Sequence, residues 1–310
     1  MPLINATGVS KWTPERLTDL TGQRFLITGG NSGIGFEAAK RLAERNADIV
    51  IGARNASKGE TACAAIAPLG AGRTELLQID LADMASIRAA ANEAKTRFGE
   101  LSALINNAGI MQTPKQQTKD GFEMQLGTNH LGHFLWTALM IGQVNQNEGR
   151  VVTVASVAHK YGKIHFDDLM LDASYDPSTA YCQSKLANLL FAQELHRRLE
   201  KSGSAIKSVG CHPGYSSTEL QSTGPTGFLN GIYKLTNSLL AQSSELGAYP
   251  TVLAAAGDEA VSGAYYGPTG IMDLRGPVGD SDVAPRALDE EVAQRLWTVS
   301  EELVGEKFTY

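Results

Sequence analysis

Residues 28–35 read TGGNSGIG, and they lie between a short apolar, strand-like run and a segment whose apolar residues have helical spacing. A glycine-rich turn from a strand into a helix is typical of a phosphate-binding loop, because the first N–H groups of a helix lack partners within it and carry partial positive charge. Gly29 permits a tight turn, Gly33 lets the backbone approach a phosphate, and Gly35 lets the helix pack closely on the sheet. The spacing differs from G-x-G-x-x-G, so an ordinary turn that uses glycine for its positive φ angle is the alternative.

Strand-like and helix-like segments alternate along much of the chain. Strands are expected at residues 24–28, 47–53, 74–80, 101–108, 149–156 and 205–214, and helices at residues 36–46, 84–99, 127–140 and 179–200. This alternation predicts βαβ units with right-handed crossovers. The expected fold class is therefore α/β, with a parallel sheet that helices cover on both faces.

The whole chain, residues 1–310, is expected to form one domain, because its length suits one large α/β domain and no boundary is visible. Residues 1–20 are predicted to form an N-terminal arm. Residues from about 215 to 245 are loosely patterned and begin with a run rich in Ser, Thr and Gly, which is typical of a substrate lid. The C-terminal extension, from about 263 to 310, contains several Gly and Pro residues and ends in a predicted helix at 289–305.

Composition argues against several classes of protein. The formal net charge is −6 and no long basic tract occurs, so no nucleic-acid partner is expected. Cys63, Cys182 and Cys211 lie far apart and form no CxxC pair, which argues for a reducing compartment and against a zinc site. The N-terminal residues lack a secretory signal, and no run of about 18 apolar residues occurs. We therefore expect a cytoplasmic protein with no membrane anchor and no metal.

The end of the second predicted strand bears on the choice of cofactor. Proteins that bind NAD place an acidic residue about twenty residues past the glycines, where it binds the ribose 2′-hydroxyl. Ala53 takes that place here, Arg54 follows, and Asp48 lies at the opposite end of the strand. An arginine without a nearby carboxylate suits a 2′-phosphate, because its planar guanidinium binds phosphate oxygens. The sequence therefore predicts NADP(H) in preference to NAD(H), and an exposed arginine with no ligand is the alternative.

A second group of residues suits acid–base chemistry. Tyr181 and Lys185 lie four apart in a predicted helix and so share one face. A phenol with an ordinary pKa of about 10 is a poor base at neutral pH, and a nearby ammonium favours its ionised form. Ser156 ends a predicted strand, where its hydroxyl can hydrogen-bond a carbonyl oxygen on which charge develops. Without the other motifs, Tyr181 and Lys185 are more simply explained as two solvent-exposed side chains on one helix face, and Ser156 as a residue that forms a turn.

With these motifs in one order, the chain resembles the short-chain dehydrogenase/reductase family. The resemblance extends from about residue 24 to residue 218. It rests on Thr28-Gly29…Gly33…Gly35, Asp80-Leu81, Asn106-Asn107-Ala108-Gly109, Asn129, Ser156, Tyr181…Lys185 and Pro213-Gly214. Each motif alone is weak evidence for the family, whereas all seven in this order are specific for it. The resemblance implies an NAD(P)-binding catalytic domain of the α/β class: a Rossmann-type doubly wound sheet of about seven parallel strands with helices on both faces.

The resemblance also implies roles for these residues. Tyr181 is the general acid in reduction and the base in oxidation, and Lys185 also holds the nicotinamide ribose. Ser156 steadies the substrate oxygen, and Asn129 helps to carry a water relay between Lys185 and solvent. An ordinary position at a helix N-terminus is the alternative for Asn129. The implied cofactor-binding residues are Gly29, Asn31, Ser32, Gly33, Ile34, Gly35, Arg54, Asp80, Leu81, Asn107, Ala108, Gly109, Tyr181, Lys185, Pro213, Gly214 and Thr218.

Several members of this set have a simpler alternative. Asp80 is implied to contact the adenine, and a cap for the next helix is equally compatible with its position. Residues 107–109 are implied to form a wall beside the adenosine ribose, or else a turn. Pro213, Gly214 and Thr218 are implied to lie beside the nicotinamide, or else at a loop corner.

Other residues near the motifs are expected to have pocket or structural roles. Met111, His159, Tyr215 and Phe228 are expected to line the substrate pocket. His130, His133 and His212 show no metal-ligand pattern, and ordinary structural roles are expected for them.

The stretch between Ser156 and Tyr181 is longer than in many family members, and it contains FDDL at residues 166–169. Such an insertion is similar to that of the branch with the retinol dehydrogenases, the WW-domain oxidoreductase and the protochlorophyllide reductases. The membrane-bound retinol enzymes of that branch carry an N-terminal anchor that is not seen in this sequence. The insertion precedes the helix through which many members oligomerise and could cap that surface, so the choice between monomer and homo-oligomer stays open.

The resulting hypothesis is an NADP(H)-dependent oxidoreductase that interconverts a carbonyl and an alcohol on a hydrophobic small molecule. Reduction of an activated C=C bond with NADPH is the alternative among enzymes, since the protochlorophyllide branch keeps the tyrosine and lysine. A non-catalytic NADP(H)-binding sensor is the alternative of another class, although such proteins commonly lose the catalytic tyrosine.

Overall fold

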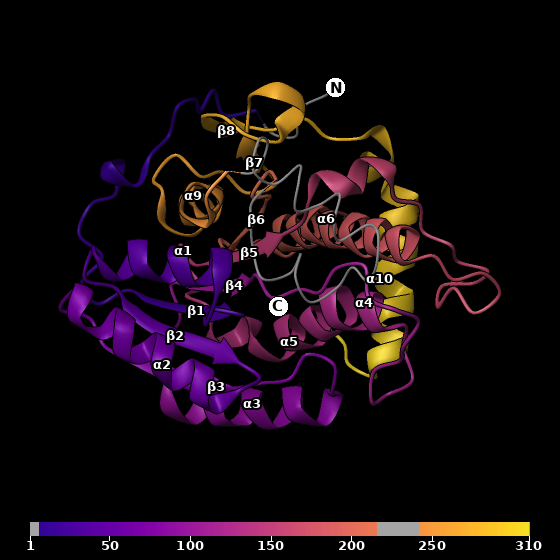
Figure 1. Cartoon of the computed structure of the whole chain (residues 1–310), viewed down its shortest axis with the longest axis horizontal. Coiled ribbons are helices and arrows are strands. Elements are labelled where there is room, and N and C mark those ends of the chain that lie inside the picture. The colour runs from indigo at the N-terminus through magenta and orange to yellow at the C-terminus, as the bar shows by residue number, and fades with distance from the viewer. Residues whose placement is uncertain (1–5, 216–241, 310) are drawn as a thin grey trace.

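One eight-stranded sheet runs through the middle of the protein (Figure 1). The computed structural model describes residues 6–215 and 242–309. The strands lie in the order β3-β2-β1-β4-β5-β6-β7-β8. Their bounds are β1 Arg24–Thr28, β2 Asp48–Ala53, β3 Thr74–Gln78, β4 Ala103–Asn106, β5 Arg150–Val154, β6 Lys207–Cys211, β7 Tyr265–Pro268 and β8 Val278–Asp280.

Seven of these strands are parallel, and β8 pairs antiparallel with β7. The expected α/β fold of the Rossmann type is therefore confirmed, with one antiparallel strand added at the edge. Strands β1–β6 fall within the six segments expected from the sequence. Strands β7 and β8 read YYGP and VGD, and they are too short and too rich in glycine and proline to show a period of two.

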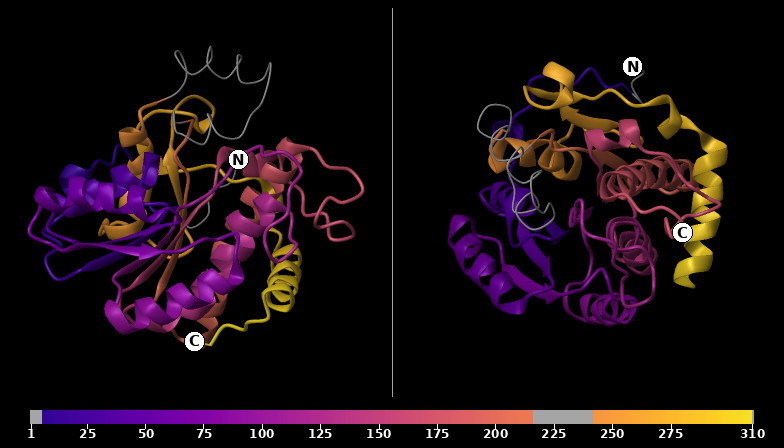
Figure 2. Two further views of the ribbon diagram at one scale, coloured as in Figure 1. Left: turned by 60° about the horizontal axis from the view of Figure 1, so that its bottom comes forward. Right: turned by 45° about the vertical axis from the view of Figure 1, so that its right-hand side comes forward.

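Helices cover both faces of the sheet (Figures 1 and 2). On one face lie α1 (Gly33–Ala43), α2 (Ala56–Ile66) and α9 (Ser244–Ala256), and on the other lie α3 (Met84–Arg97), α5 (Gly132–Met140) and α6 (Pro177–Ser202). The short helical elements are α4 (Met124–Leu126), η1 (Pro14–Arg16), η2 (Ala67–Leu69), η3 (Gly127–Leu131), η4 (Ile141–Gln143), η5 (Val157–Tyr161), η6 (Ile271–Asp273) and η7 (Pro285–Leu288).

The side chains of β1 alternate between the two layers. Phe25 and Ile27 belong to the core that includes α1 and α9, whereas Leu26 belongs to the core that includes α3 and α5. Successive side chains of a strand point to opposite faces, so a strand covered on both faces is apolar throughout. This explains why the run FLI precedes the glycine loop.

The C-terminal helix α10 (Glu290–Val304) packs on the outer side of α6 (Figure 2). Residues 183–195 of α6 are buried without interruption, because the sheet covers one side of the helix and α10 covers the other. The ring of Trp297 stacks on that of Phe191 with centroids 5.6 Å apart, and the Arg198 guanidinium lies 4.4 Å from the Trp297 ring.

The insertion before α6 packs on the same helix. The Gln183 side chain of α6 accepts from the His165 N–H at 2.9 Å and donates to the Leu169 carbonyl oxygen at 2.9 Å. Where the insertion meets α10, Arg295 lies 4.0 Å from the centroid of the Phe166 ring. The insertion and α10 therefore both cover α6, and the choice between monomer and homo-oligomer stays a prediction. The contribution of α10 is not visible in the sequence, because the contact joins segments about a hundred residues apart along the chain.

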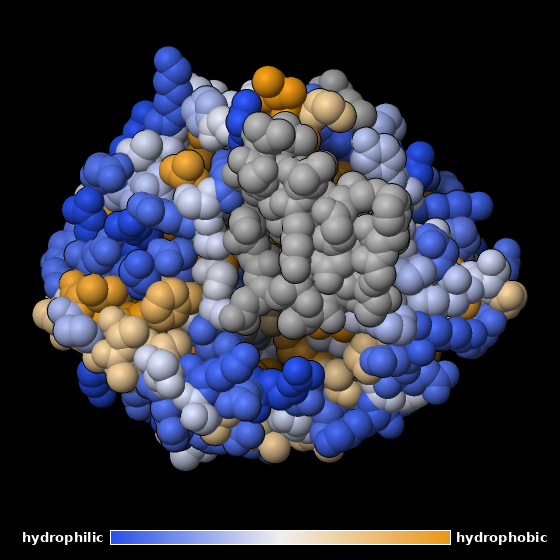
Figure 3. Space-filling view, viewed as in Figure 1, coloured by the Kyte–Doolittle hydropathy of each residue, from blue (hydrophilic) through white to orange (hydrophobic). Residues whose placement is uncertain are grey.

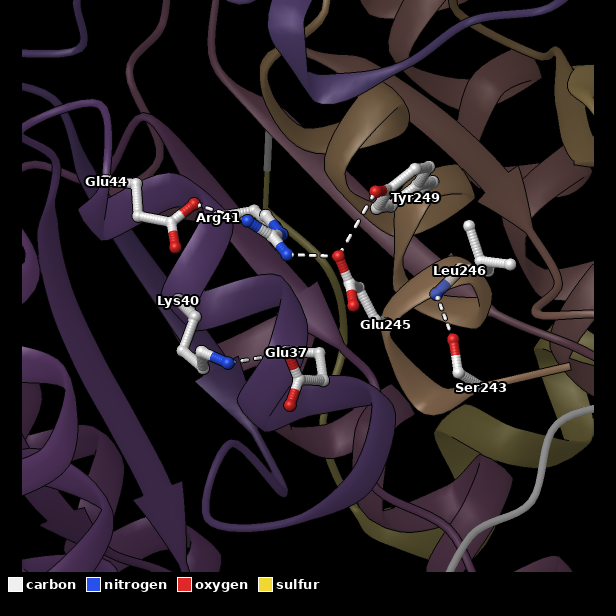
Figure 4. A network of polar contacts seen from close by, with 8 residues as sticks. All are labelled: Glu37, Lys40, Arg41, Glu44, Ser243, Glu245, Leu246 and Tyr249. Carbon is white, nitrogen blue, oxygen red and sulfur yellow. Dashed lines mark hydrogen bonds and ion pairs between the residues drawn. The ribbon is translucent and has the colours of Figure 1, made fainter.

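A polar network ties α9 to α1, the helix that follows the glycine loop (Figure 4). Arg41 of α1 forms ion pairs with Glu44, at 2.7 Å, and with Glu245 of α9. The Tyr249 hydroxyl donates to Glu245 at 3.4 Å, and the Ser243 side chain caps the start of α9. The network holds the beginning of α9 beside α1.

Among residues 6–215 and 242–309, no helix is both long enough and apolar enough to span a bilayer. The face drawn in Figure 3 is mostly hydrophilic where its residues are described, with hydrophobic residues in small groups. Tyr161, Ile271 and Met272 are among the large apolar side chains that are exposed. Exposed apolar residues in small number are normal on a folded protein.

We expect Trp297→Ala to lower the free energy of unfolding by about 3–5 kcal/mol, because it removes a buried ring between α10 and α6 and leaves a cavity. Urea unfolding followed by circular dichroism measures the change. Thr298→Ala, at the exposed neighbouring position, is the matched control and should lie within about 0.5 kcal/mol of the wild type. Equal effects of the two substitutions would show that α10 is not part of the core.

Candidate active site

Loops from several strands meet at the carboxyl edge of the sheet, where the parallel strands β1, β4, β5 and β6 end. The strand order reverses between β1 and β4, and open α/β sheets bind their ligands in the crevice at such a point. The glycine loop follows β1, residues 107–110 follow β4, Ser156 follows β5, and residues 212–215 follow β6. Most of the predicted site residues therefore lie along one edge.

The glycine loop has the geometry that its three glycines predict. Gly29 and Gly33 have φ angles of 66° and 55°, in the left-handed region that favours glycine. A Cβ atom on Gly35 would lie 2.5 Å from the Gly29 carbonyl oxygen and would collide with the Asn107 side chain, so only glycine lets α1 begin this close to the sheet. Ser32 is the N-cap residue, but its side chain makes no capping hydrogen bond. The N–H groups in the first turn of α1 therefore receive no hydrogen bond from that hydroxyl. The glycine loop and this first turn fit the pyrophosphate of a dinucleotide.

Thr28, the last residue of β1, joins the glycine loop to the loop after β4. Its Oγ1 atom accepts hydrogen bonds from the backbone N–H groups of Asn107 and Ala108, at 3.0 and 3.1 Å. The Asn107 side chain in turn donates to the Thr28 carbonyl oxygen at 2.8 Å. Residues 107–109 are thus fixed beside the glycine loop, in the place implied for a wall of the cofactor site.

His133 extends this network towards Asn129. Its Nδ1 atom lies 3.0 Å from the Asn129 carbonyl oxygen, which can only accept, so Nδ1 carries the proton. Its Nε2 atom, 2.8 Å from Thr28 Oγ1, is then the acceptor. Burial lowers the pKa of His133 to about 4, so the ring is neutral and this arrangement is satisfied.

Asn129 lies inside the π-helical turn η3 and not at a helix N-terminus, so the simpler alternative for this residue is wrong. Its side chain accepts from the Ile110 N–H at 2.8 Å and donates to the Ile110 carbonyl oxygen at 2.9 Å. It also donates to Ser184 Oγ on α6 at 2.9 Å. A π-turn inside a helix often marks a functional position, and this one turns Asn129 towards both β4 and α6.

Lys185 connects α6 to the carboxyl end of β5. Its Nζ atom donates to the Val154 carbonyl oxygen at 3.2 Å, and Asn188 donates to the same oxygen at 3.2 Å. The side chain is buried, and burial lowers its pKa to about 8. A Cβ atom on Gly109 would lie 3.4 Å from Nζ and 3.2 Å from Asn129 Oδ1, which places the Gly109 backbone beside both groups.

Tyr181 lies one turn before Lys185 on the same face of α6, with its ring centroid 5.9 Å from the Lys185 Nζ atom. Ser156 is the N-cap of η5, and its Oγ atom accepts from the Ala158 N–H at 3.2 Å. That bond leaves the hydroxyl hydrogen of Ser156 available for donation. Gly162, at the end of η5, packs on α6: a Cβ atom there would collide with the Cys182 carbonyl group and lie 2.8 Å from Leu186 Cβ. The serine loop therefore rests on the first turns of the tyrosine helix.

The ends of β2 and β3 carry the residues expected near the adenosine. Arg54 is exposed and forms no ion pair with a described residue. Asp48, at the other end of β2, is bonded to Arg24 at 2.8 Å and to Arg73 at 3.2 Å. The side chain of Asp80 accepts from Ala82 N–H at 3.0 Å.

The cap of α3 is not Asp80. Asp83 takes that place, and its carboxylate accepts from the N–H groups of Ala85 and Ser86. The capping alternative for Asp80 is therefore wrong. Its contact with the adenine stays a prediction, as does that of Leu81, which is buried beside it.

The loop after β6 lies against the C-terminal extension. Gly214 has a φ angle of 67°, and the Pro213 carbonyl oxygen accepts from the Gln242 side chain at 2.6 Å. Tyr215 donates its backbone N–H to the Leu274 carbonyl oxygen at 2.7 Å. Thr218, Phe228 and most of the expected lid lie outside the described residues.

The histidines do not form a metal site: within the described ranges, no group of three or more His, Cys, Asp or Glu could hold a metal ion. His130, His133 and His212 are buried and hydrogen-bonded, as expected for structural residues. His159 is wholly buried, so it does not line an open pocket, contrary to expectation. Met111 and Tyr215 are partly buried at the site edge.

Thr28, His133 and Asn188 position the predicted catalytic residues, although the sequence does not single them out for that purpose. Thr28 belongs to the glycine motif, but nothing in the motif says that its hydroxyl bonds the loop after β4. Asn188 lies one turn after Lys185, and that spacing is the one available signal that both reach the same carbonyl.

Comparisons with known proteins identify what the chain is similar to. A family model described as short chain dehydrogenase matches residues 23–226. Retinol dehydrogenase 14 of Homo sapiens is 37% identical, with 92% of this chain and 87% of that protein covered. Retinol dehydrogenase 12 of Bos taurus is 40% identical, with 92% of this chain and 87% of that protein covered.

Solved structures share the fold of this chain. The crystal structure of an uncharacterized protein from Mycobacterium paratuberculosis has a TM-score of 0.81 and 36% identity, with 97% of this chain and 100% of that chain covered. A short chain dehydrogenase from Burkholderia cenocepacia, solved in complex with NADP, has a TM-score of 0.64 and 24% identity, with 80% of this chain and 96% of that chain covered. At that identity the likeness shows a shared fold.

The depressed pKa of Lys185 makes the stability of the cofactor-free protein depend on pH. The folded protein binds this proton with a pKa of about 8, against 10.5 for an ordinary lysine. Below about pH 8 the buried ammonium is charged and costs about 3 kcal/mol, and between about pH 8 and 10.5 stability rises as the folded protein releases the proton before the unfolded chain does. We expect Lys185→Met to be more stable than the wild type at neutral pH, with an advantage that shrinks towards about pH 10.

Urea midpoints at these two pH values measure the difference. Lys95→Met, on the exposed side of α3, is the control and should change stability little at either pH. An advantage of Lys185→Met that is equal at both pH values, or a loss of stability at neutral pH, would contradict the depressed pKa.

Proposed function

Because the chain belongs to the short-chain dehydrogenase/reductase family, we propose that Asn129, Ser156, Tyr181 and Lys185 are its catalytic residues and NADP(H) its preferred cofactor. The family and the retinol dehydrogenase relatives make the protein an oxidoreductase that acts on CH–OH and C=O groups. The observation that carries the residue assignment is the convergence of Lys185, Asn129 and Gly109. Lys185 lies one turn of α6 after Tyr181, and its Nζ atom bonds the carbonyl oxygen of Val154, two residues before Ser156.

In the proposed mechanism, the protein residues position the substrate oxygen and move one proton. The Ser156 hydroxyl donates a hydrogen bond to that oxygen, which is stronger when negative charge develops there. The Tyr181 hydroxyl gives its proton to the oxygen in reduction and takes it back in oxidation. The Lys185 ammonium favours the ionised form of Tyr181, and Asn129 supports the path by which the proton is replaced. A bound nicotinamide cofactor supplies or accepts the hydride.

The cofactor would lie along the edge of the sheet from the glycine loop to α6. The proposed phosphate and adenosine residues are Gly29, Asn31, Ser32, Gly33, Ile34, Gly35, Arg54, Asp80, Leu81, Asn107, Ala108 and Gly109, and those of the nicotinamide half are Tyr181, Lys185, Pro213, Gly214 and Thr218. Arg54 supports NADP(H) over NAD(H), because its exposed guanidinium has no carboxylate partner among the described residues and is free to bind a 2′-phosphate.

The proposed substrate is a hydrophobic alcohol, aldehyde or ketone. The relatives that act on retinol, by their names, support an apolar substrate of this kind. We further propose that the whole chain forms one catalytic domain, since the sheet continues without interruption from β3 to β8 and its last strands come from the C-terminal extension. A cytoplasmic location and the oligomeric state stay predictions.

We expect Tyr181→Phe to bind NADPH as the wild type does and to lose about 10²–10⁴-fold in kcat for carbonyl reduction, because it removes only the transferable proton. Binding is measured by NADPH fluorescence, and turnover by loss of the 340 nm band over a set of ketones, aldehydes and activated alkenes. Tyr161→Phe, an exposed tyrosine at the end of η5, is the matched control and should keep wild-type turnover. Activity that survives in Tyr181→Phe would exclude this tyrosine as the acid, and turnover of alkenes alone would favour C=C reduction.

We expect Arg54→Ala to weaken NADPH binding by about tenfold or more while leaving NADH binding nearly unchanged, because only NADPH offers a 2′-phosphate to the guanidinium. Arg73→Ala is the control: Arg73 is also exposed, but it lies at the opposite end of β2. Dissociation constants for both cofactors test the prediction. An equal loss for NADPH and NADH would refute the role of Arg54 in cofactor choice.

A further inference from the structure

Two buried histidines lie in the loops that follow the neighbouring strands β5 and β6. His159 follows β5 in the loop that begins with Ser156, and His212 follows β6 directly before Pro213 and Gly214. Their exposed fractions are 0% and 1%. Neither side chain has a part in the proposed proton transfer, so the reason for burying two polar rings must be sought in their hydrogen bonds.

His159 joins the serine loop to the chain beyond β8. Its Nδ1 atom donates to the Ser156 carbonyl oxygen at 2.7 Å, and its Nε2 atom accepts from the backbone N–H of Ala284 at 3.2 Å. Because a carbonyl oxygen can only accept and an amide N–H can only donate, both contacts require the neutral ring with its proton on Nδ1. Burial lowers the pKa of His159 to about 4, which keeps the ring neutral.

His212 makes the complementary pair of contacts at the next strand end. Its Nδ1 atom accepts from the Gly214 N–H at 3.1 Å, so Nε2 carries the proton and donates to Ser281 Oγ at 2.7 Å. Burial lowers its pKa to about 3. Each histidine therefore uses one ring nitrogen to fix a site loop and the other to reach residues 281–284.

The packing around the two rings leaves them little freedom. Tyr265 of β7 contacts both: its ring lies edge-on to His159, with centroids 5.5 Å apart, and stacks on His212 at 5.2 Å. Any Cβ atom on Gly267 would collide with the His212 ring. The rings are thus held at fixed angles between the strand ends and the chain beyond β8.

Further contacts join the same parts of the protein. Lys160 of η5 forms a largely buried ion pair with Asp273, and Arg286 donates to the Gly162 carbonyl oxygen. A side chain on Gly214 would collide with the Leu274 carbonyl group. The serine loop and the loop after β6 are therefore both fastened to the C-terminal extension, although they have no covalent connection to each other at this edge.

We propose that residues 281–284, which we name the strap, hold the serine loop and the Pro213–Gly214 loop in register through His159 and His212, which act as positioning residues. The part of this inference that concerns catalysis rests on the proposed function, in which these two loops carry the serine and contact the nicotinamide. A small displacement of reacting groups lowers the rate of an enzyme strongly, so a shared anchor for the two loops has a direct use.

Ser281→Ala tests the branch through His212, because it removes the acceptor of the Nε2 proton and touches no catalytic residue. In the cofactor-free protein, hydrogen exchange of the His212, Gly214 and Tyr215 amides should become faster by about three- to tenfold, the effect of one lost hydrogen bond. The dissociation constant for NADPH should rise by about the same factor. Ser300→Ala is the matched control, since Ser300 also bonds a buried histidine, His130, at 2.9 Å but lies on α10.

His159→Asn tests the other branch. The amide nitrogen of asparagine takes the place of Nδ1 and still donates to the Ser156 carbonyl oxygen, but the shorter side chain offers no acceptor to Ala284. We expect kcat for carbonyl reduction to fall by about three- to tenfold with NADPH affinity within about twofold of the wild type. The first branch is thus expected to appear in NADPH affinity and the second in kcat with NADPH affinity nearly unchanged, a difference that a general loss of stability would not produce.

The proposal is refuted if Ser281→Ala changes hydrogen exchange of the His212, Gly214 and Tyr215 amides no more than Ser300→Ala does. The positioning role of the strap is overturned if exchange becomes faster while NADPH affinity and kcat keep their wild-type values. A wild-type protein that turns over no carbonyl or alcohol would refute the proposed function, and the exchange comparison would still decide whether the strap holds the two loops.

Discussion

The ammonium group of Lys185 is buried, and the arrangement of the candidate site follows from the polar groups around it. Its Nζ atom donates to the Val154 carbonyl oxygen, which also accepts from Asn188, so α6 is fixed on the end of β5. A buried charge is costly unless polar groups surround it. The Gly109 backbone lies beside both Nζ and the Asn129 side chain, and Tyr181 lies one turn before Lys185 on the same face of α6.

A chain of buried hydrogen bonds connects this centre to the glycine loop. Asn129 is held by Ile110 and Ser184, His133 bonds the Asn129 carbonyl oxygen, and Thr28 bonds His133 and the loop after β4. The predicted phosphate end and the predicted reactive end of the site therefore share one polar network. Fully satisfied buried networks of this kind favour a single arrangement of their members.

Much of the fold and most of the candidate site could be predicted from the sequence, because the informative signals are local. The glycine loop shows its three special positions directly, and strand ends in a parallel sheet place Ser156, Asn107 and Gly29 at one edge. The π-turn at Asn129 could not be predicted, because nothing in residues 127–131 distinguishes a π-turn from an ordinary helical turn. Sequence patterns also could not predict the packing of α10 on α6 or the contacts of His159 and His212, because these contacts join residues far apart in the chain. Strands β7 and β8 were too short to show a pattern.

Lys185 is held in a buried position that favours its neutral form more than water does. Selective ¹³C labelling of the lysine side chains, with Lys185 assigned by comparison with Lys185→Met, allows its titration to be followed by NMR. We expect a pKa of about 8 for Lys185 in the folded, cofactor-free protein. A pKa at or above the ordinary lysine value of about 10.4 would contradict the burial on which the site depends.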